Sequence, residues 1–176
     1  MKIRNFIVTM ALMFVTVFAF AQNNDDRRVM KDAEKAISTL KKSDIGLEKF
    51  FNNSSGYVVF PNVGEGALVV GAASGNGVVY ENGMPKGMAD MKKLDIGLQA
   101  GGEAYMQVIF FETEDALNEF KQGNFEFSAE AKAVIVDKGA SKKANYNDGV
   151  ITFVKSKAGA MADISVGGQK FKYSEF

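Results

Sequence analysis

The segment from Ala104 to Phe111 constrains the fold more than any other part of this chain. It reads AYMQVIFF, and its residues are nearly all apolar on both sides of the two-residue alternation of a β-strand. A strand that is apolar on both faces has to be covered on both faces, so this segment predicts a buried sheet. After it, Thr113 predicts the cap of a short helix, and Gly123 is a natural end for that helix.

Two further helices are predicted before a region of many short strands. The first covers about residues 27–42 and has an apolar stripe on one side, while a shorter one is capped by Ser43 or Asp44 and holds Leu47 and Phe50. The strands that we expect lie at residues 57–60, 67–72, 77–81, 86–90, 94–100, 104–112, 124–129, 131–137, 149–155, 159–166 and 169–173.

Glycine is frequent among these strands, with 18 glycines in the chain. Because no long helix separates the strands, the sheet should be mostly antiparallel. Glycine inside strands also indicates tight bends. The predicted class is therefore α+β, with a mostly antiparallel, strongly curved, barrel-like sheet, N-terminal helices and one short inserted helix. Hairpin-type pairs are expected to form turns at Asn76-Gly77, Asn82-Gly83, Asp148-Gly149 and Gly167-Gly168.

The first 21 residues have the organisation of a signal peptide. Lys2 and Arg4 precede an apolar run, and Ala19-Phe20-Ala21 fits the small-x-small cleavage rule. The run is shorter than the roughly 20 residues that a membrane-spanning helix needs. We therefore expect export to a periplasmic or secreted location, with cleavage near Ala21 and a single domain over residues 22–176. The chain has no cysteine, which excludes a lipid-modified N-terminus and disulfides.

The composition also excludes several classes of chemistry. The chain has no histidine and no cysteine, so Ser-His-Asp triads, thiol nucleophiles and histidine zinc sites are ruled out. Lys and Arg together equal Asp and Glu at 21 each, which is no nucleic-acid footprint. The string from Ser38 to Lys41 matches S-x-x-K, but the companion motifs of such enzymes are missing. We expect no catalytic residue, no metal and no cofactor.

The first predicted helix carries the surface with the clearest functional signal. Four basic residues fall within about 60° of one another on the helical wheel, nearly opposite the apolar stripe: Arg28, Lys31, Lys35 and Lys42. A basic face of this kind can lie against anionic head groups. The alternative is a helix that docks on the sheet and leaves these side chains in solvent. Lys170 and Lys172 form a second, weaker basic group.

Three segments together resemble the SYLF domain, a lipid-binding family. They are GYVVFPNVGEGALVVGAASGNGVVYENG (56–83), DIGLQAGGEAYMQVIFFETEDALNEFKQGNFEFSAEA (95–131) and GVITFVKSKAGAMADISVGGQKFKY (149–173). Many relatives carry a Trp-Ser-Pro-like segment where this chain reads GMPKGMADM and has no tryptophan. The resemblance implies lipid binding that involves the N-terminal segment and basic surface. Eukaryotic members are also described as actin regulators, a partner that an exported, bacterial-type member would not meet.

The function that we predict is non-enzymatic binding of anionic lipid or phospholipid at a membrane surface, in an exported compartment. One alternative is a structural or envelope-stress protein that binds another protein through an exposed sheet edge. Another is a carrier that holds a small apolar ligand in a sheet pocket lined by Met84, Met88, Met91 and Met106. A hydrolase comes last. The sequence carries no signal for an oligomeric state.

Overall fold

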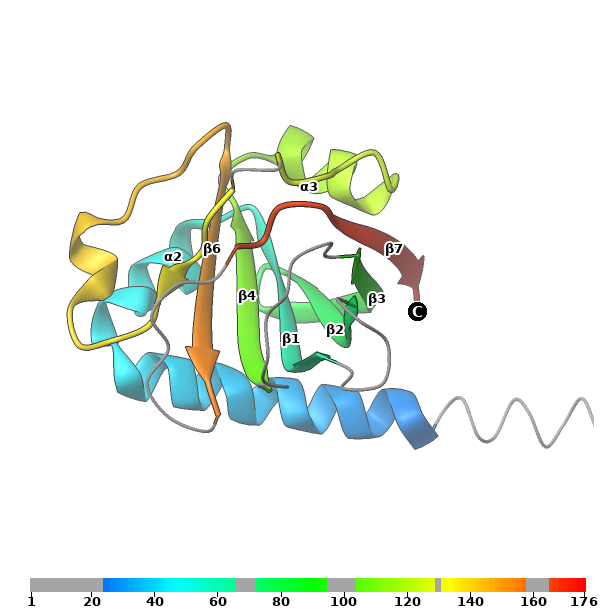
Figure 1. Ribbon diagram of the computed structural model, residues 1–176, viewed down its shortest axis with the longest axis horizontal. Helices are drawn as coiled ribbons and strands as arrows, with labels where there is room; N and C mark the ends of the chain where they lie inside the picture. Colours follow the sequence, from blue (N-terminus) through cyan, green and yellow to red (C-terminus); the bar gives the residue numbers. More distant parts are fainter. Residues whose placement is uncertain (1–23, 66–71, 95–103, 129–130, 158–164) are drawn as a thin grey trace, which may run out of the picture.

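The computed structural model describes residues 24–65, 72–94, 104–128, 131–157 and 165–176. Within these residues seven strands form one sheet, in the order β5-β6-β4-β1-β2-β3-β7 (Figure 1). The strands are β1 (Gly56–Glu65), β2 (Ala72–Glu81), β3 (Met84–Leu94), β4 (Tyr105–Phe111), β5 (Val134–Ile135), β6 (Val150–Ser156) and β7 (Gln169–Glu175). All neighbours are antiparallel except β5 and β6, which run parallel. The predicted α+β class and mostly antiparallel sheet are confirmed.

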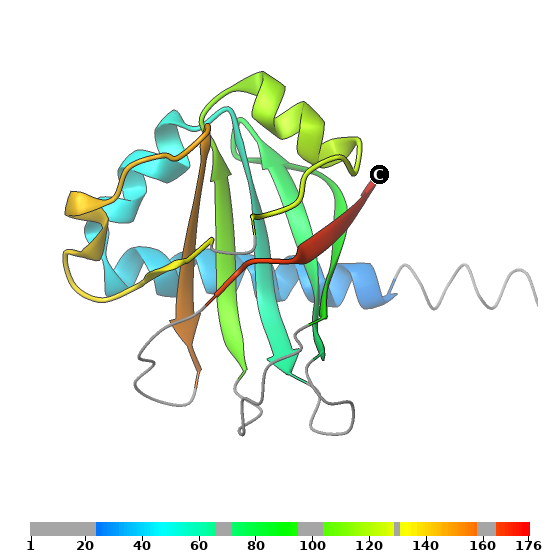
Figure 2. The ribbon, with the colours of Figure 1, turned by 45° about the horizontal axis from the view of Figure 1, so that its top comes forward.

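One face of the sheet is covered by the N-terminal helical region. A long helix occupies residues 24–43, and η1 (Ile45–Leu47) and α2 (Glu48–Asn53) follow it. Figures 1 and 2 show the long helix lying across the sheet. Its apolar stripe packs on the central strands, where Ala33, Ala36 and Leu40 are buried. The first predicted helix is therefore confirmed, and within the described residues it begins slightly before residue 27.

The opposite face is covered by α3 (Glu114–Lys121), by the chain that follows it and by β7. The Thr113 side chain accepts a hydrogen bond from the backbone N–H of Ala116, and Gly123 adopts a positive φ of 74° just past the helix. Both ends of this helix were predicted. A short contact of 2.6 Å between Lys121 Nζ and Glu81 Oε1 ties α3 to the end of β2.

Strand β4 lies at the centre of this three-layer arrangement, as its sequence predicts. Val108 and Phe110 belong to the core that faces the N-terminal helices, whereas Ile109 and Phe111 belong to the core that faces α3. All four are 0% exposed. The two cores are separate, because successive side chains of a strand point to opposite faces of the sheet.

The predicted barrel-like closure is wrong. The sheet is open and not strongly curled, and its two edge strands are β5 and β7. Two of the strand glycines lie where another group approaches closely. A Cβ on Gly77 would lie 2.6 Å from the Phe60 ring, and one on Gly56 would lie 2.7 Å from a methyl of Leu117. Glycine in these strands therefore makes room for neighbours instead of closing a barrel.

Several turns and strands also differ from the prediction. Asn76-Gly77 lies inside β2, whereas Asn82-Gly83 forms the predicted turn between β2 and β3 with positive φ at both residues. Within the described residues, the predicted strands 124–129 and 131–137 reduce to isolated bridges, Glu126 with Lys170 and Lys132 with Ser165, and to the two-residue β5. The predicted strands 67–72, 94–100 and 159–166 fall largely outside the described residues. So does the predicted signal peptide. Among the residues that the structure describes, no helix is long and apolar enough to cross a membrane.

Candidate functional site: the outward face of the N-terminal helix

The four basic residues predicted as a row all lie on the outward face of the long helix. Arg28, Lys31, Lys35 and Lys42 are exposed, whereas the stripe on the other side is buried in the core. The helix therefore docks through its apolar side and shows its basic side to solvent. Both hypotheses, a lipid-binding face and a docked helix whose basic side chains are only solvated, predict this arrangement. The contacts of the individual side chains are therefore needed to distinguish them.

Two members of the row have acidic partners on the same helix. Arg28 lies 3.3 Å from Asp25, and Lys35 lies 3.2 Å from Asp32. Both pairs are three residues apart and largely exposed, and such pairs contribute little to stability. Lys31 and Lys42 have no acidic group within 4 Å among the described residues. The row thus consists of two neutralised and two unneutralised cations.

An exposed apolar residue, Ile45, follows the basic row directly. Its side chain is 78% exposed, more than that of any other large hydrophobic residue among those described. Ile45 lies three positions after Lys42, so the two Cα atoms are at most about 11 Å apart. Sequence reasoning missed it because Ile45 reads as part of the second helix. The sequence feature that could have indicated its exposure is its position directly after the cap residue Asp44, outside the apolar stripe.

Lys41 and Lys49 flank the same end of the helix and each lies over an aromatic ring. Lys41 Nζ is 4.9 Å from the centroid of Phe51, and Lys49 Nζ is 4.6 Å from that of Phe50. Cation–π contacts of this kind favour a fixed position for each ammonium group, and both lysines lie four residues from Ile45 in the chain. The segment where the long helix ends, residues 41–49, therefore carries an exposed apolar side chain and three lysines.

Asp44 fixes the geometry of this helix end. Its side chain is buried, with Oδ1 accepting from the Gly46 N–H at 3.0 Å and Oδ2 accepting from the Ser141 N–H at 2.7 Å. Burial alone would raise the pKa of the carboxyl. The hydrogen bonds outweigh burial, so the pKa lies below its ordinary value. Asp44 therefore stays ionised and joins η1, which begins at Ile45, to the distant η2 (Ala140–Lys143).

A shallow groove of about 230 Å³ lies beside the row, between the long helix and the sheet. Lys35 and Thr39 line it from the helix, Asn62 lines it from β1, and Lys157 lines it from the position just after β6. The Lys157 ammonium group donates to the Asn62 side-chain oxygen. Lys157 is a further cation near the row that the helical wheel could not reveal, because it is far away in sequence.

The second predicted basic group lies elsewhere. Lys170 and Lys172 belong to the edge strand β7, which Figures 1 and 2 show on the far side of the sheet from the long helix. Lys170 is paired with Glu126 at 3.9 Å, and Lys172 is opposite Asp90 on β3. The structure therefore does not bring these two residues together with the helix row. Lysines on an edge strand also discourage pairing with another chain, which weakens the edge-binding alternative.

The methionine pocket predicted for a carrier is not formed. Met91 is buried in the core under α3, Met84 is exposed on the β2–β3 turn, and Met88 and Met106 are partly buried on the other face of the sheet. Alternation along β3 separates Met88 from Met91, so they cannot line one cavity. No group of three or more acidic side chains that could hold a metal ion occurs in the described part of the chain.

Comparison with known proteins gives one family. Residues 92–175 match the model of the Ysc84 family, described as "Las17-binding protein actin regulator". The matched range includes β4, α3, β6 and β7 but ends well short of the basic helix. No curated protein matches the chain.

Proposed function

From the premise that residues 92–175 place this chain in the SYLF domain family, we propose that the protein binds anionic lipid at a membrane surface. The proposed contact is the outward face of the N-terminal helix. The observation that carries this proposal is the 78% exposure of Ile45, three residues after Lys42, the last residue of the basic row. We propose a binding role without catalysis.

The docked state of the helix decides the mode of binding. Its apolar stripe is already buried against the sheet, so the helix cannot insert into the lipid layer without unfolding part of the core. Attraction then comes mainly from charge, at about 1 kcal/mol for each basic side chain close to the surface. One exposed isoleucine can add about 1.5–3 kcal/mol if it becomes fully buried among lipid. The proposed association is therefore peripheral, reversible and sensitive to salt.

Vesicle co-sedimentation of the protein tests this proposal. Lys31 and Lys42 have no acidic partner within the described structure, so replacing both by Gln should weaken binding to anionic vesicles by roughly 10- to 30-fold. The matched control is Lys170→Gln with Lys172→Gln, which removes the same charge from the edge strand β7 on the far side of the sheet and should have little effect. Replacing Arg28 and Lys35 instead should weaken binding less, because their charges are already compensated.

A second variant isolates the apolar contribution. Ile45→Asn removes the exposed side chain and keeps every charge, so it should weaken binding while leaving the salt dependence unchanged. Equal binding of the protein to neutral and anionic vesicles, with no change in either double variant, would show that the basic row is only a solvated helix face.

We also propose that the protein acts after export, in the periplasm or outside the cell. The support is the leader with Lys2, Arg4 and Ala19-Phe20-Ala21. N-terminal sequencing of the native protein should then begin at or near Gln22. A cytoplasmic protein that retains Met1 would contradict this part of the proposal.

A further inference from the structure

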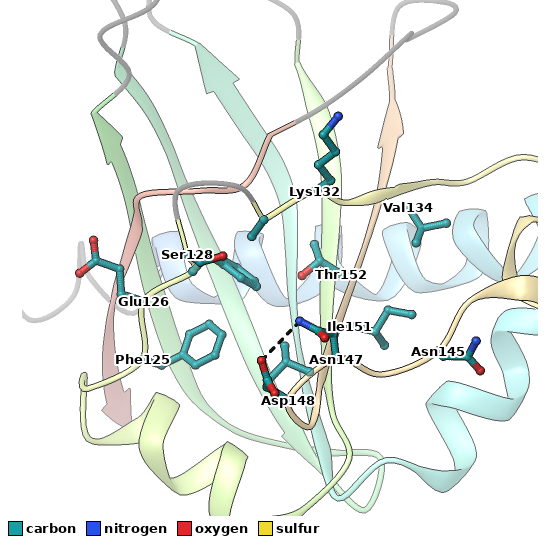
Figure 3. A pocket seen from close by; sticks show the side chains of 13 residues that line it. Phe125, Glu126, Ser128, Lys132, Val134, Asn145, Asn147, Asp148, Ile151 and Thr152 are labelled. Atoms are coloured by element: carbon teal, nitrogen blue, oxygen red, sulfur yellow. Dashed lines mark hydrogen bonds between the residues drawn. The ribbon is translucent and has the colours of Figure 1, made fainter.

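A second, larger cleft lies away from the basic helix. Its volume is about 470 Å³, within the range of small-molecule sites, and it is bounded by the chain that follows α3, by β6 and by the turn before β6 (Figure 3). Phe125, Phe127 and Ile151 are among its apolar walls, and Asn147, Asp148 and Thr152 are among its polar ones. Neither the family description nor the membrane proposal assigns a role to it.

The aromatic wall of this cleft is held in place from behind. The rings of Phe125 and Phe127 meet edge to face with their centroids 4.9 Å apart. Both rings also contact Phe171 of β7, each at 5.9 Å. A wall fixed by several ring contacts can receive a ligand without first having to order itself, which favours binding.

Thr152 supplies a polar group that has no partner. Its side chain is only 4% exposed, and its hydroxyl oxygen makes no hydrogen bond within the described structure. Thr152 lines the cleft, and Figure 3 shows it beside Asn147 and Ile151. An unsatisfied buried hydroxyl costs stability, and a ligand group that bonded to it would recover that loss.

The charges around the cleft are unequal. Asp148 lies on the turn before β6 and has one hydrogen bond there, a long one of 3.4 Å from the Asn147 amide to one carboxylate oxygen. Glu126 is paired with Lys170 outside the cleft at 3.9 Å, and Figure 3 shows its carboxylate turned away. Lys132 lines the cleft as well, and Figure 3 shows it and Asp148 at opposite ends. The end that holds Phe125 and Asp148 is therefore the negative end.

We propose that this cleft binds a small amphiphilic ammonium compound. The ammonium group lies at Asp148, where the carboxylate and the nearby Phe125 ring both favour a cation. The aliphatic body lies against Phe127 and Val150, which line the cleft and belong to the same core, and a polar atom of the ligand bonds to the Thr152 hydroxyl. This site is separate from the basic helix face, so ligand binding in the cleft does not depend on membrane binding.

Calorimetric titration with octylammonium tests the site, with octanoate and octanol as probes of the same length. Octylammonium should bind more tightly than octanol, and octanoate should not bind measurably. Asp148→Asn should weaken octylammonium binding on the order of tenfold. Asp148 has a φ of +49°, a conformation that Asn adopts readily, so this variant should keep the turn. Asp137→Asn removes an exposed carboxylate outside the cleft and serves as the matched control.

Thr152→Val gives an independent readout. It removes the unpartnered hydroxyl, so it should raise the melting temperature of the free protein while weakening the binding of octylammonium several-fold. If Thr152 had only a structural role, the variant would not combine a higher melting temperature with weaker binding of octylammonium. Unchanged affinity in both variants, or binding of octanoate as tight as that of octylammonium, would overturn the proposal.

Discussion

Gln107 and Gln169 exchange two hydrogen bonds in the core beneath α3. The Gln107 amide nitrogen donates to the Gln169 oxygen at 2.7 Å, and the Gln169 nitrogen donates back to the Gln107 oxygen at 3.0 Å. Both side chains are 0% exposed. Gln107 lies on the central strand β4 and Gln169 begins the edge strand β7, so the pair attaches the start of β7 to the face of the sheet.

Removing both amides of this pair should cost less than the sum of the losses from removing each one alone. Gln107→Met or Gln169→Met alone leaves a buried amide without its partner, at about 1–3 kcal/mol of unfolding free energy. The double variant should be less destabilised than the sum of the single variants, because no unpaired amide remains. Urea unfolding of the four proteins measures this coupling, and strictly additive losses would mean that the two amides are not bonded to each other.

The Asp44 contacts predict a loss of stability in acid. The pKa of the folded carboxyl lies below its ordinary 3.8, so the ionised form is favoured by folding. That stabilisation is fully present above about pH 4 and is lost as the pH falls through the lowered pKa. Asp44→Asn should cost about 1–3 kcal/mol near neutral pH and should flatten the acid side of the stability profile. Unfolding curves between pH 2 and 7, on the order of one per pH unit, would check this. The exposed variant Asp137→Asn should reproduce the wild-type slope.

Phe110 should be among the most sensitive core positions. It is 0% exposed and its ring contacts Phe50, Phe51 and Phe153 at 5.6, 4.8 and 5.9 Å. Phe110→Ala removes the centre of this cluster and should cost about 3–5 kcal/mol. A denaturant midpoint that corresponds to a loss below about 1 kcal/mol would mean that this core can collapse around the cavity.

Two glycines in neighbouring strands offer a matched comparison. A Cβ at Gly77 would lie 2.6 Å from the Phe60 ring and 2.8 Å from the Val59 carbonyl oxygen, whereas a Cβ at Gly64 would have nothing within 4 Å. Gly77→Ala should therefore cost about 1–3 kcal/mol through overpacking. Gly64→Ala should be neutral or slightly stabilising, because it restricts the unfolded chain. Equal melting temperatures for the two variants would show that Phe60 can move aside.

The elements that sequence reasoning predicted well are those with a local cause. The two-faced apolar run of β4 required cover on both sides, and Thr113 with Gly123 marked the ends of α3, because alternation, capping and positive φ depend on near neighbours in the chain. The basic row of the helix was equally readable, since a 3.6-residue period fixes which side chains share a face. The exposure of all four residues follows from the same period once the apolar stripe is buried.

Tertiary structure alone decided the rest. The frequency of glycine among the strands was read as a sign of a barrel, but at positions 56 and 77 the glycines make room for the approach of Leu117 and Phe60. Lys157 reaches the row, Gln169 meets Gln107, and Asp148 shares a cleft with Phe125, each across a gap in sequence that no local pattern spans. A local sequence pattern indicates the environment or backbone conformation that a residue favours, such as burial or a left-handed turn. Which distant group meets that need is set only when the strands pair and the layers pack.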